Sequence, residues 1–235
     1  MHTGSGIGAI RALVEAGIKR ASAPEGEGAR RVLRPVVTIS RETGAGVIAV
    51  AEQLAARLSS GGDPWSVYDR ELLERISADH DLSLRIVESL DERDKSWFEH
   101  LTAGLSFQDT GLDLPLKAAR TIFGMSRAGY GIIVGRGSQM VLHGLPNVVH
   151  VRLIAPLDWR VQHICELENV SAEEAGKIIQ TRDRSREQYV KRHFRRNVAD
   201  PLLYHVVINR GSVDAETAAE MIEDVVASVT ATLES

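Results

Sequence analysis

The feature that most constrains the fold of this chain is a regular alternation of short apolar segments with longer amphipathic ones. We expect five buried strands, at residues 35–39, 65–68, 131–134, 147–153 and 204–208. Helical periodicity marks residues 47–58, 136–143, 157–168 and 215–233, together with segments starting after Asp69 and at Ser171. Because helices separate the strands, the alternation favours an α/β fold whose five-stranded parallel sheet is covered by helices on both faces.

The same reading divides the chain into an extension and one domain. Residues 1–34 combine apolar positions at helical spacing with a Gly- and Pro-containing stretch, which predicts a helix followed by a linker. A compact domain is expected over residues 35–235. Within it, residues 81–128 show helical periodicity and no convincing strand, so we expect a helical insertion there.

Composition excludes several classes of protein. The formal net charge of -4 argues against a dedicated nucleic-acid binder. No apolar run reaches the roughly 18 residues that cross a bilayer, and no secretory signal is evident, so a cytoplasmic protein is expected. Cys165 is the single cysteine, and no metal site is expected. Asp91, Glu92 and Asp94 are interleaved with cations, which favours a solvated helix end over a metal site.

A candidate anion site follows the first predicted strand. Residues 40–46 contain Gly44 and Gly46 and lead directly into the next helix, whose free N–H groups attract anions. The full phosphate-binding motif places a Lys and a Ser or Thr after the last glycine. Here those positions hold Val47, Ile48 and Ala49. A tight strand-to-helix turn without a ligand is therefore an alternative interpretation of the 40–46 loop.

Positive charge is concentrated in residues 182–196, which hold seven Lys or Arg and two acidic residues. Guanidinium groups bind phosphate in a bidentate manner and stabilise charge in phosphoryl transfer. A solvated helix face is one alternative interpretation. A nucleic-acid patch is a weaker one, because only Tyr189 and Phe194 offer rings for base stacking.

Taken together, these segments resemble the cytidylate kinase-like family of nucleoside monophosphate kinases, from about residue 35 to the C-terminus. The resemblance rests on Thr38-Ile-Ser-Arg-Glu-Thr-Gly-Ala-Gly46, Tyr68-Asp-Arg-Glu-Leu-Leu73, Leu90-Asp-Glu-Arg-Asp94, Ile133-Val-Gly-Arg-Gly-Ser138, Asp183-x-x-Arg186 and Asp200-Pro-x-x-Tyr204. It implies a P-loop kinase fold with a helical insertion and an arginine-rich lid, here residues 180–198. It also implies transfer of the ATP γ-phosphoryl group to CMP or dCMP with Mg²⁺.

The resemblance assigns roles by position. It implies that Thr43, Gly44, Ala45, Gly46 and Val47 face the ATP phosphates. Arg136 would grip the monophosphate, with Arg41 as a second phosphate contact. Asp183 would contact the base or ribose and Arg186 a phosphate. The charge of the 182–196 segment adds Arg182 and Arg192 to Arg186 as catalytic candidates, which would stabilise charge on the transferred group. Asp69 is expected to cap the helix that follows it and is kept as a nucleotide-binding candidate.

The chain also departs from the family pattern. The family's loop lysine falls on Val47, and the arginine of a related branch falls on Ile48. Acidic residues that flank the Gly-Arg pair fall on Val134 and Gly137. We therefore expect a nucleotide-binding phosphotransferase with a degenerate phosphate loop. A catalytically weak or inactive regulatory protein that binds nucleotide or phosphate is the alternative, and a homo-oligomer is left open.

Overall fold

The computed structural model describes residues 33–90 and 114–234, with a few further positions at 12, 15, 16, 19, 94–96, 98 and 99. Its centre is a five-stranded sheet in the order β2-β3-β1-β4-β5, in which every strand pair is parallel. The strands are β1 (Val36–Arg41), β2 (Ser66–Tyr68), β3 (Gly131–Val134), β4 (Val148–Ile154) and β5 (Val206–Asn209). The predicted five-stranded parallel sheet is confirmed, with β1 at its centre.

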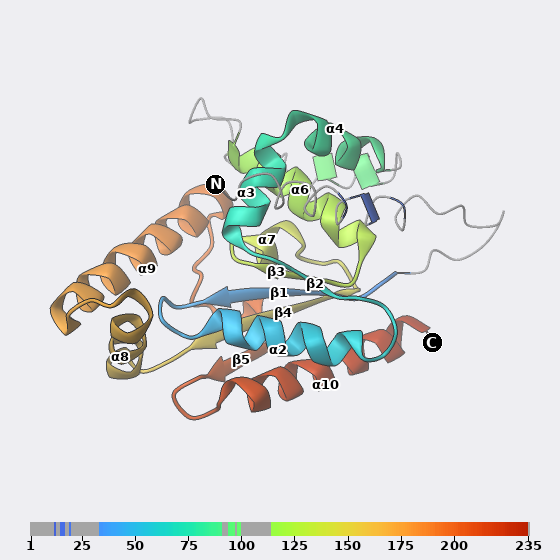
Figure 1. The fold of residues 1–235 in the computed structure, drawn as a ribbon. Helices are drawn as coiled ribbons and strands as arrows, with labels where there is room; N and C mark the ends of the chain where they lie inside the picture. Colours follow the sequence, from blue (N-terminus) through green and yellow to red (C-terminus); the bar gives the residue numbers. More distant parts are fainter. Residues whose placement is uncertain are drawn as a thin grey trace.

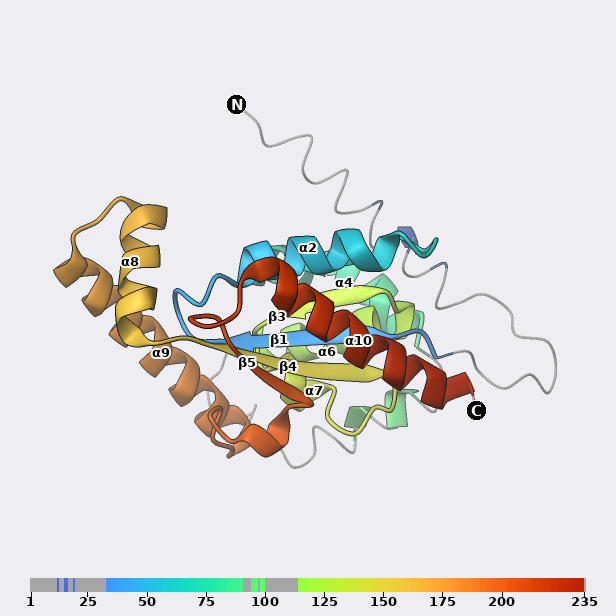
Figure 2. The ribbon, with the colours of Figure 1, turned by 90° about the horizontal axis from the view of Figure 1, so that it is seen from below.

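Helices cover both faces of this sheet and extend beyond one end of it (Figure 1). One face carries α2 (Val47–Ser59) and α10 (Ala215–Glu234). The other carries α3 (Arg70–Ala78), α4 (His80–Glu88), α6 (Leu114–Ala128) and the short α7 (Ser138–Val141). Two helices, α8 (Leu157–Glu168) and α9 (Ala172–Phe194), project past the carboxyl ends of the strands (Figure 2), and η2 (Pro201–Leu203) leads into β5.

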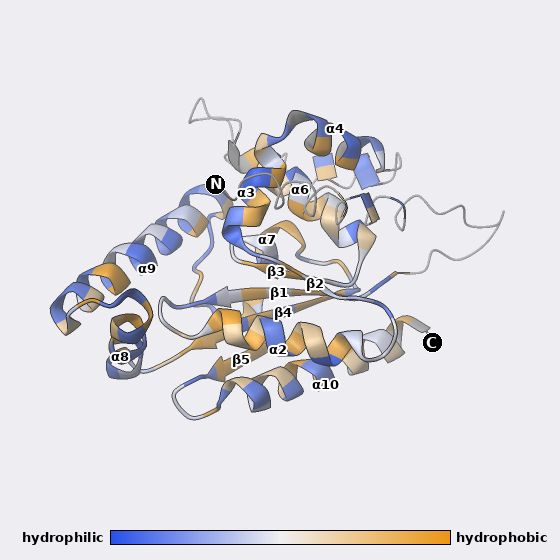
Figure 3. Cartoon of the chain, in the orientation of Figure 1, coloured by the Kyte–Doolittle hydropathy of each residue, from blue (hydrophilic) through white to orange (hydrophobic). Residues whose placement is uncertain are grey.

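Two hydrophobic cores hold these layers together, one on each face of the sheet. Successive side chains of a strand point to opposite faces, so Val36 joins the core under α3 and α6. Val37 and Ile39 join the core under α2 and α10. A third, smaller cluster around Ile164 and Ile179 joins α8 to α9. Figure 3 shows the strands as largely hydrophobic and α9 as largely hydrophilic, as expected for a helix beyond the main core.

The observed boundaries agree with the sequence in most places and differ in two. The helix predicted at 136–143 is only α7, because Arg136 and Gly137 adopt left-handed backbone conformations. The lid predicted at 180–198 consists of the second half of α9 and the four residues that follow it. This helix is continuous over 23 residues and begins at a capping box on Ser171. The arginine-rich segment is therefore held at a fixed helical spacing up to Phe194.

One polar residue was placed wrongly by the sequence. Asp94 was expected on a solvated helix end, but its side chain is buried and pairs with the buried Arg127 at 3.1 Å. Asp91 and Glu92 lie outside the described residues. The extension 1–34 also lies mostly outside them, although Glu15 pairs with Arg85 of α4 at 2.6 Å. Among the described residues, no helix has the length and apolar character needed to span a bilayer.

Candidate functional site

The 40–46 loop joins β1 to α2 at the carboxyl end of the sheet, where ligands bind in parallel α/β folds. Gly44 and Gly46 have positive φ angles of 84° and 69°, a region that glycine occupies without strain. Gly46 is the N-cap of α2 and offers no side chain to the first N–H groups of that helix. At positions 47–49 the first turn carries only hydrocarbon side chains, and Ile48 is 49% exposed.

The first turn of α8 covers this loop. A Cβ atom added to Gly44 would lie 2.8 Å from the carbonyl oxygen of Arg160, so only glycine allows this approach. A Cβ atom added to Gly46 would lie 3.5 Å from the Trp159 ring and 3.7 Å from Nη2 of Arg210. Arg210 is itself buried. The loop therefore sits beneath α8 with two arginines beside it, neither of which the sequence had singled out.

A carboxylate from α9 closes the loop. Oδ1 of Asp183 accepts hydrogen bonds from the backbone N–H of Thr43 at 2.8 Å and from its hydroxyl at 2.7 Å. Arg186 donates to the same oxygen at 2.9 Å and also to Oγ1 of Thr43. Arg160 donates to Oδ2 of Asp183 at 2.6 Å. Four donors, two of them charged, thus converge on one carboxylate.

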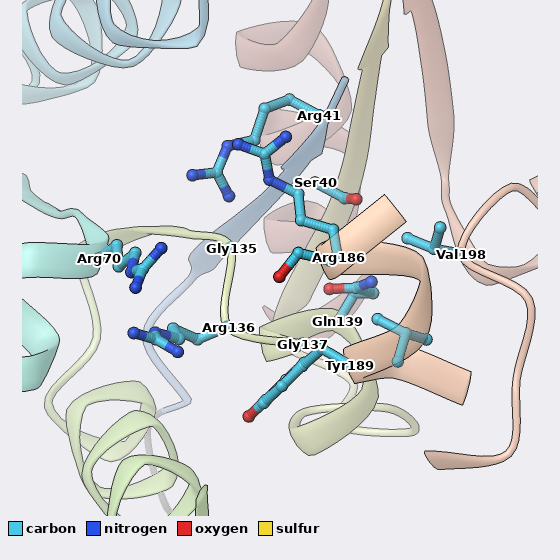
Figure 4. A pocket seen from close by; sticks show the side chains of 12 residues that line it. Ser40, Arg41, Arg70, Gly135, Arg136, Gly137, Gln139, Arg186, Tyr189 and Val198 are labelled. Carbon is cyan, nitrogen blue, oxygen red and sulfur yellow. The ribbon is translucent and has the colours of Figure 1, made fainter. Parts of the chain in front are cut away.

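Next to the loop lies a cavity of about 140 Å³, which we call the arginine cavity. Four guanidinium groups line it, each from a different element (Figure 4): Arg41 ends β1, Arg70 starts α3, Arg136 follows β3, and Arg186 comes from α9. The wall is completed by Ser40, Gly135, Gly137, Gln139, Ser185, Tyr189, Val190 and Val198. Such a gathering of cations has the chemistry of an anion site.

The turn after β3 positions two of these cations, Arg136 and Arg41. Arg136 has a positive φ of 55° and stands between Gly135 and Gly137, which are left-handed as well. A Cβ atom on Gly135 would lie 2.0 Å from Nη1 of Arg41, so the glycine makes room for that guanidinium group. Glu74 of α3 pairs with both Arg136 and Arg70, the latter at 3.1 Å. The turn and α3 together fix the directions of the cavity's arginines.

The electrostatics of the cavity favour a negatively charged ligand. Burial, followed by the nearby charges of Arg186, Arg70 and Arg136, lowers the pKa of Arg41 to about 10. Burial and the charge of Arg70 also lower the pKa of Arg136. A lowered pKa in a cation means that its charged form is disfavoured where it lies. An anion between these groups would remove that penalty.

A second, larger cavity of about 660 Å³ continues from the first. It shares Arg41, Arg70, Ser185 and Arg186 with the arginine cavity and adds Ile48, Asp69, Glu71, Glu74, Val134, Thr181 and Arg182. Asp69 caps α3 as predicted, because its Oδ1 accepts from the N–H of Leu72 at 2.8 Å. An anion held in the first cavity can therefore carry a larger group that extends into the second.

The remaining sequence-based candidates are only partly brought together. Arg182 lines the larger cavity and pairs with Glu168, which ties α9 to α8. Arg192 is exposed and lines neither of these two cavities. The Asp183 side chain of α9 contacts Thr43 of the 40–46 loop and lines neither cavity. Ala45 and Val47 contribute backbone and packing, since their side chains belong to the core under α2.

Sequence reasoning missed several residues of the site. Arg70 lies in the Tyr68–Leu73 motif that carries the resemblance, so a signal was present although no role was assigned to it. Gln139 lines the arginine cavity, and its Nε2 donates to the Tyr204 hydroxyl at 3.3 Å. Its buried Oε1 has no hydrogen-bond partner among the described residues and is a spare acceptor. Arg160 and Arg210 lie in none of the motifs quoted above, so nothing in the neighbouring sequence pointed to a role at the site.

The sequence profile of the cytidylate kinase-like family matches residues 36–212, a range that includes all five strands together with α8 and α9. The chain belongs to the cytidylate kinase-like family. This membership indicates a kinase-like function and nucleotide binding. No cluster of three or more His, Cys, Asp or Glu residues that could hold a metal ion occurs in the part of the chain that the structure describes.

One solved structure has the same overall fold as this chain. An uncharacterized protein from Eubacterium ventriosum superposes with a TM-score of 0.64 at 24% identity, over 83% of this chain and 99% of that chain. TT1252 from Thermus thermophilus gives 0.47 at 18% identity, over 84% and 98%. A uronate isomerase from Corynebacterium glutamicum is 28% identical over 92 residues, which are 39% of this chain. The match spans only 18% of the length of that curated relative.

Proposed function

We propose that this chain is a phosphotransferase that moves the terminal phosphoryl group of ATP to a nucleoside monophosphate such as CMP or dCMP. The observation that supports it best is the arginine cavity, where four guanidinium groups from four elements meet. A phosphate monoester carries close to two negative charges at neutral pH and offers three acceptor oxygens. It therefore suits this cavity better than a carboxylate or a neutral sugar.

The rest of the acceptor has room in the adjoining cavity. With its phosphate among Arg41, Arg70 and Arg136, a nucleoside monophosphate would extend its ribose and base into the larger cavity. The attacking oxygen of such an acceptor already belongs to an ionised phosphate. The chain then needs no general base, and its contribution is positioning and neutralisation of charge. Arg186, which lies in both cavities and on the 40–46 loop, is the residue placed to act on the transferred group.

Mg²⁺ is part of the reaction implied by the family, but the first turn of α2 lacks the Ser or Thr that would hold it. Positions 47–49 supply no oxygen ligand, and Oδ1 of Asp183 is already shared by three donors. Mg²⁺ is commonly held by substrate phosphates and water. We therefore include it only as a companion of ATP and assign no step to it.

A binding experiment with matched ligands tests the proposal. We expect calorimetry to give an affinity for CMP at least about 100-fold higher than for cytidine, because the phosphate supplies most of the charged contacts. Arg136→Gln should weaken CMP binding about tenfold or more. Arg75→Gln, which removes an exposed arginine of the same neighbourhood outside both cavities, should leave it unchanged.

Turnover then separates the enzyme from the alternative. ADP release from ATP should depend on CMP, dCMP or UMP, with the preferred acceptor giving the highest kcat/KM. Binding of CMP without any acceptor-dependent ADP release would support the regulatory, phosphate-binding alternative, which the hydrocarbon side chains at 47–49 favour. Equal binding of CMP and cytidine would overturn both functions.

A further inference from the structure

The contacts of Asp183 are those of a bound anion rather than of an ordinary surface ion pair. Its two oxygens accept from the backbone N–H and the hydroxyl of Thr43, from Arg186 and from Arg160, all within 2.6–2.9 Å. Thr43 is buried, and the two arginines come from different helices, α8 and α9. A phosphate group accepts the same set of donors, with one more oxygen to share among them.

Arg160 also has unused capacity toward such a ligand. Its buried Nε makes no hydrogen bond to a described residue, although it forms an ion pair with Oε2 of Glu42 at 3.6 Å. Its Nη1 reaches the carbonyl oxygen of Thr43 at 3.4 Å as well as Asp183. The side chain is only 12% exposed, so it is held over the loop by its surroundings. It thus brings a positive charge to a loop that has no lysine of its own.

We propose that Asp183 is a resident anion in the place of the donor's terminal phosphate, and that Arg160 and Arg186 hold this phosphate once Asp183 has turned away. The inference rests on the proposed function, whose donor is a nucleoside triphosphate, and it adds two things. It assigns the missing lysine's charge to Arg160, which lies on a helix remote in sequence. It also makes Asp183 a built-in competitor of the donor.

Competition between Asp183 and the polyphosphate should lower the observed affinity for the polyphosphate. Only molecules whose Asp183 has left Thr43 can accept the polyphosphate, so the observed affinity is the intrinsic one multiplied by the fraction that is open. Removing the carboxylate sets that fraction to one. If the closed state holds about nine-tenths of the molecules, the variant gains about tenfold in affinity. Removing Arg160 takes away a cation from the site and should act in the opposite direction.

Inorganic tripolyphosphate is the probe of choice, since it carries the polyphosphate charge without a base or ribose. We expect calorimetry to show that Asp183→Ala binds it about tenfold more tightly than the parent chain, and that Arg160→Gln binds it about tenfold more weakly. Glu187→Ala serves as the matched control, because it removes one exposed carboxylate from the same helix. It should change the affinity less than twofold.

A second variant and a second measurement guard against loss of folding. Asp183→Asn keeps the shape of the side chain without its charge and should also bind more tightly, by a smaller factor. In the parent chain, tripolyphosphate should shift the Thr43 amide resonance, whose hydrogen bond changes from carboxylate to phosphate. An unchanged or weaker affinity in both folded Asp183 variants would overturn the inference.

The outcome is independent of the proposed acceptor. If CMP binds and is phosphorylated while the Asp183 variants behave like Glu187→Ala, the inference fails alone. If tripolyphosphate binding rises in the Asp183 variants but no acceptor is phosphorylated, the proposed reaction fails and the anion site stands. Arg160 also holds Asp183 in place, so its own contribution is measured in the Asp183→Ala background. A tripolyphosphate affinity that Arg160→Gln leaves unchanged in that background would remove Arg160 from the site.

Discussion

The arginine cavity and the 40–46 loop lie side by side and both depend on guanidinium groups, but their charges are balanced differently. At the loop, Arg160 and Arg186 share the carboxylate of Asp183, whose contacts are all short. In the cavity, the largely enclosed Arg41 has three other arginines around it, and desolvation followed by their charges lowers its pKa. Glu74 pairs with Arg70 and Arg136, and Asp183 pairs with Arg186, so among the cavity's arginines only Arg41 has no ion pair with a described carboxylate. The loop therefore has an internal substitute for its ligand, whereas the cavity keeps one cation that lacks a carboxylate partner.

The two regions illustrate two ways in which a protein can balance the charges of an anion site while the ligand is absent. A cavity that holds a cation without a carboxylate partner favours an anion but lowers the stability of the empty protein. A site closed by its own carboxylate keeps the empty protein stable and weakens ligand binding by competition. The chain combines both, and Arg186 belongs to each of them.

The largest expected effect comes from Arg186→Gln, because this change acts on both regions at once. We expect kcat/KM for phosphoryl transfer to fall by about 100- to 1000-fold, the range found when one preorganised donor is removed from a reacting group. Arg184→Gln removes an exposed arginine of the same helix and should have little effect. A loss confined to CMP affinity, with normal affinity for tripolyphosphate, would show that Arg186 serves only the cavity.

Acidic pH should lower the stability of the fold before it changes the relative anion affinities of the cavity and the loop. Burial, together with His205 and His143, lowers the pKa of His150 to about 3. The unfolded chain takes up this proton below about pH 6.5 and the folded chain only near pH 3, so stability is lost as the pH falls between these values. The loss should approach about 1.4 kcal/mol per pH unit.

Urea unfolding at a series of pH values measures this effect. The pH dependence of the free energy of unfolding should flatten in His150→Asn. It should persist in the control His163→Gln, because the His163 ring lies beside the 40–46 loop rather than next to His150. An equally steep dependence in His150→Asn would assign the acid sensitivity to other groups. Anion affinities of the two regions are therefore best compared above about pH 7, where a phosphate monoester is also mostly doubly ionised.

Arg41→Gln should act on the cavity in two opposite directions. Affinity for CMP should fall by about tenfold, because a charged donor is lost. Stability should rise by about 1 kcal/mol or more, because a buried cation is removed from among like charges. Calorimetry and urea unfolding measure the two effects. A fall in both affinity and stability would mean that the cavity is not short of negative charge in the empty protein.

The smallest effect is expected from restoring a cation at the loop. Ile48→Arg places a guanidinium group on the exposed first turn of α2 and should tighten tripolyphosphate binding by about threefold at low salt. The gain should disappear at high salt, since exposed charges are screened. No gain at any salt concentration would indicate that Arg160 and Arg186 already satisfy the anion.

The sequence predicted most of the fold because strands and helices depend on local patterns. The Asp69 cap, the Ser171 capping box and the five strands all follow from residues within a few positions of one another. The site was harder to predict, since Arg160 meets Thr43 across more than 100 residues through the packing of α8. The buried Asp94 was missed for the same reason, because its partner Arg127 lies on another helix.

The left-handed backbone of Arg136 has a consequence for anyone who engineers this protein. A side chain other than glycine in that conformation costs on the order of 1 kcal/mol, and two left-handed glycines flank it. Glycine at position 136 would relieve this strain. A library screened only for heat resistance should therefore enrich glycine at position 136, and its winners would lack the cation that we place on the ligand's phosphate.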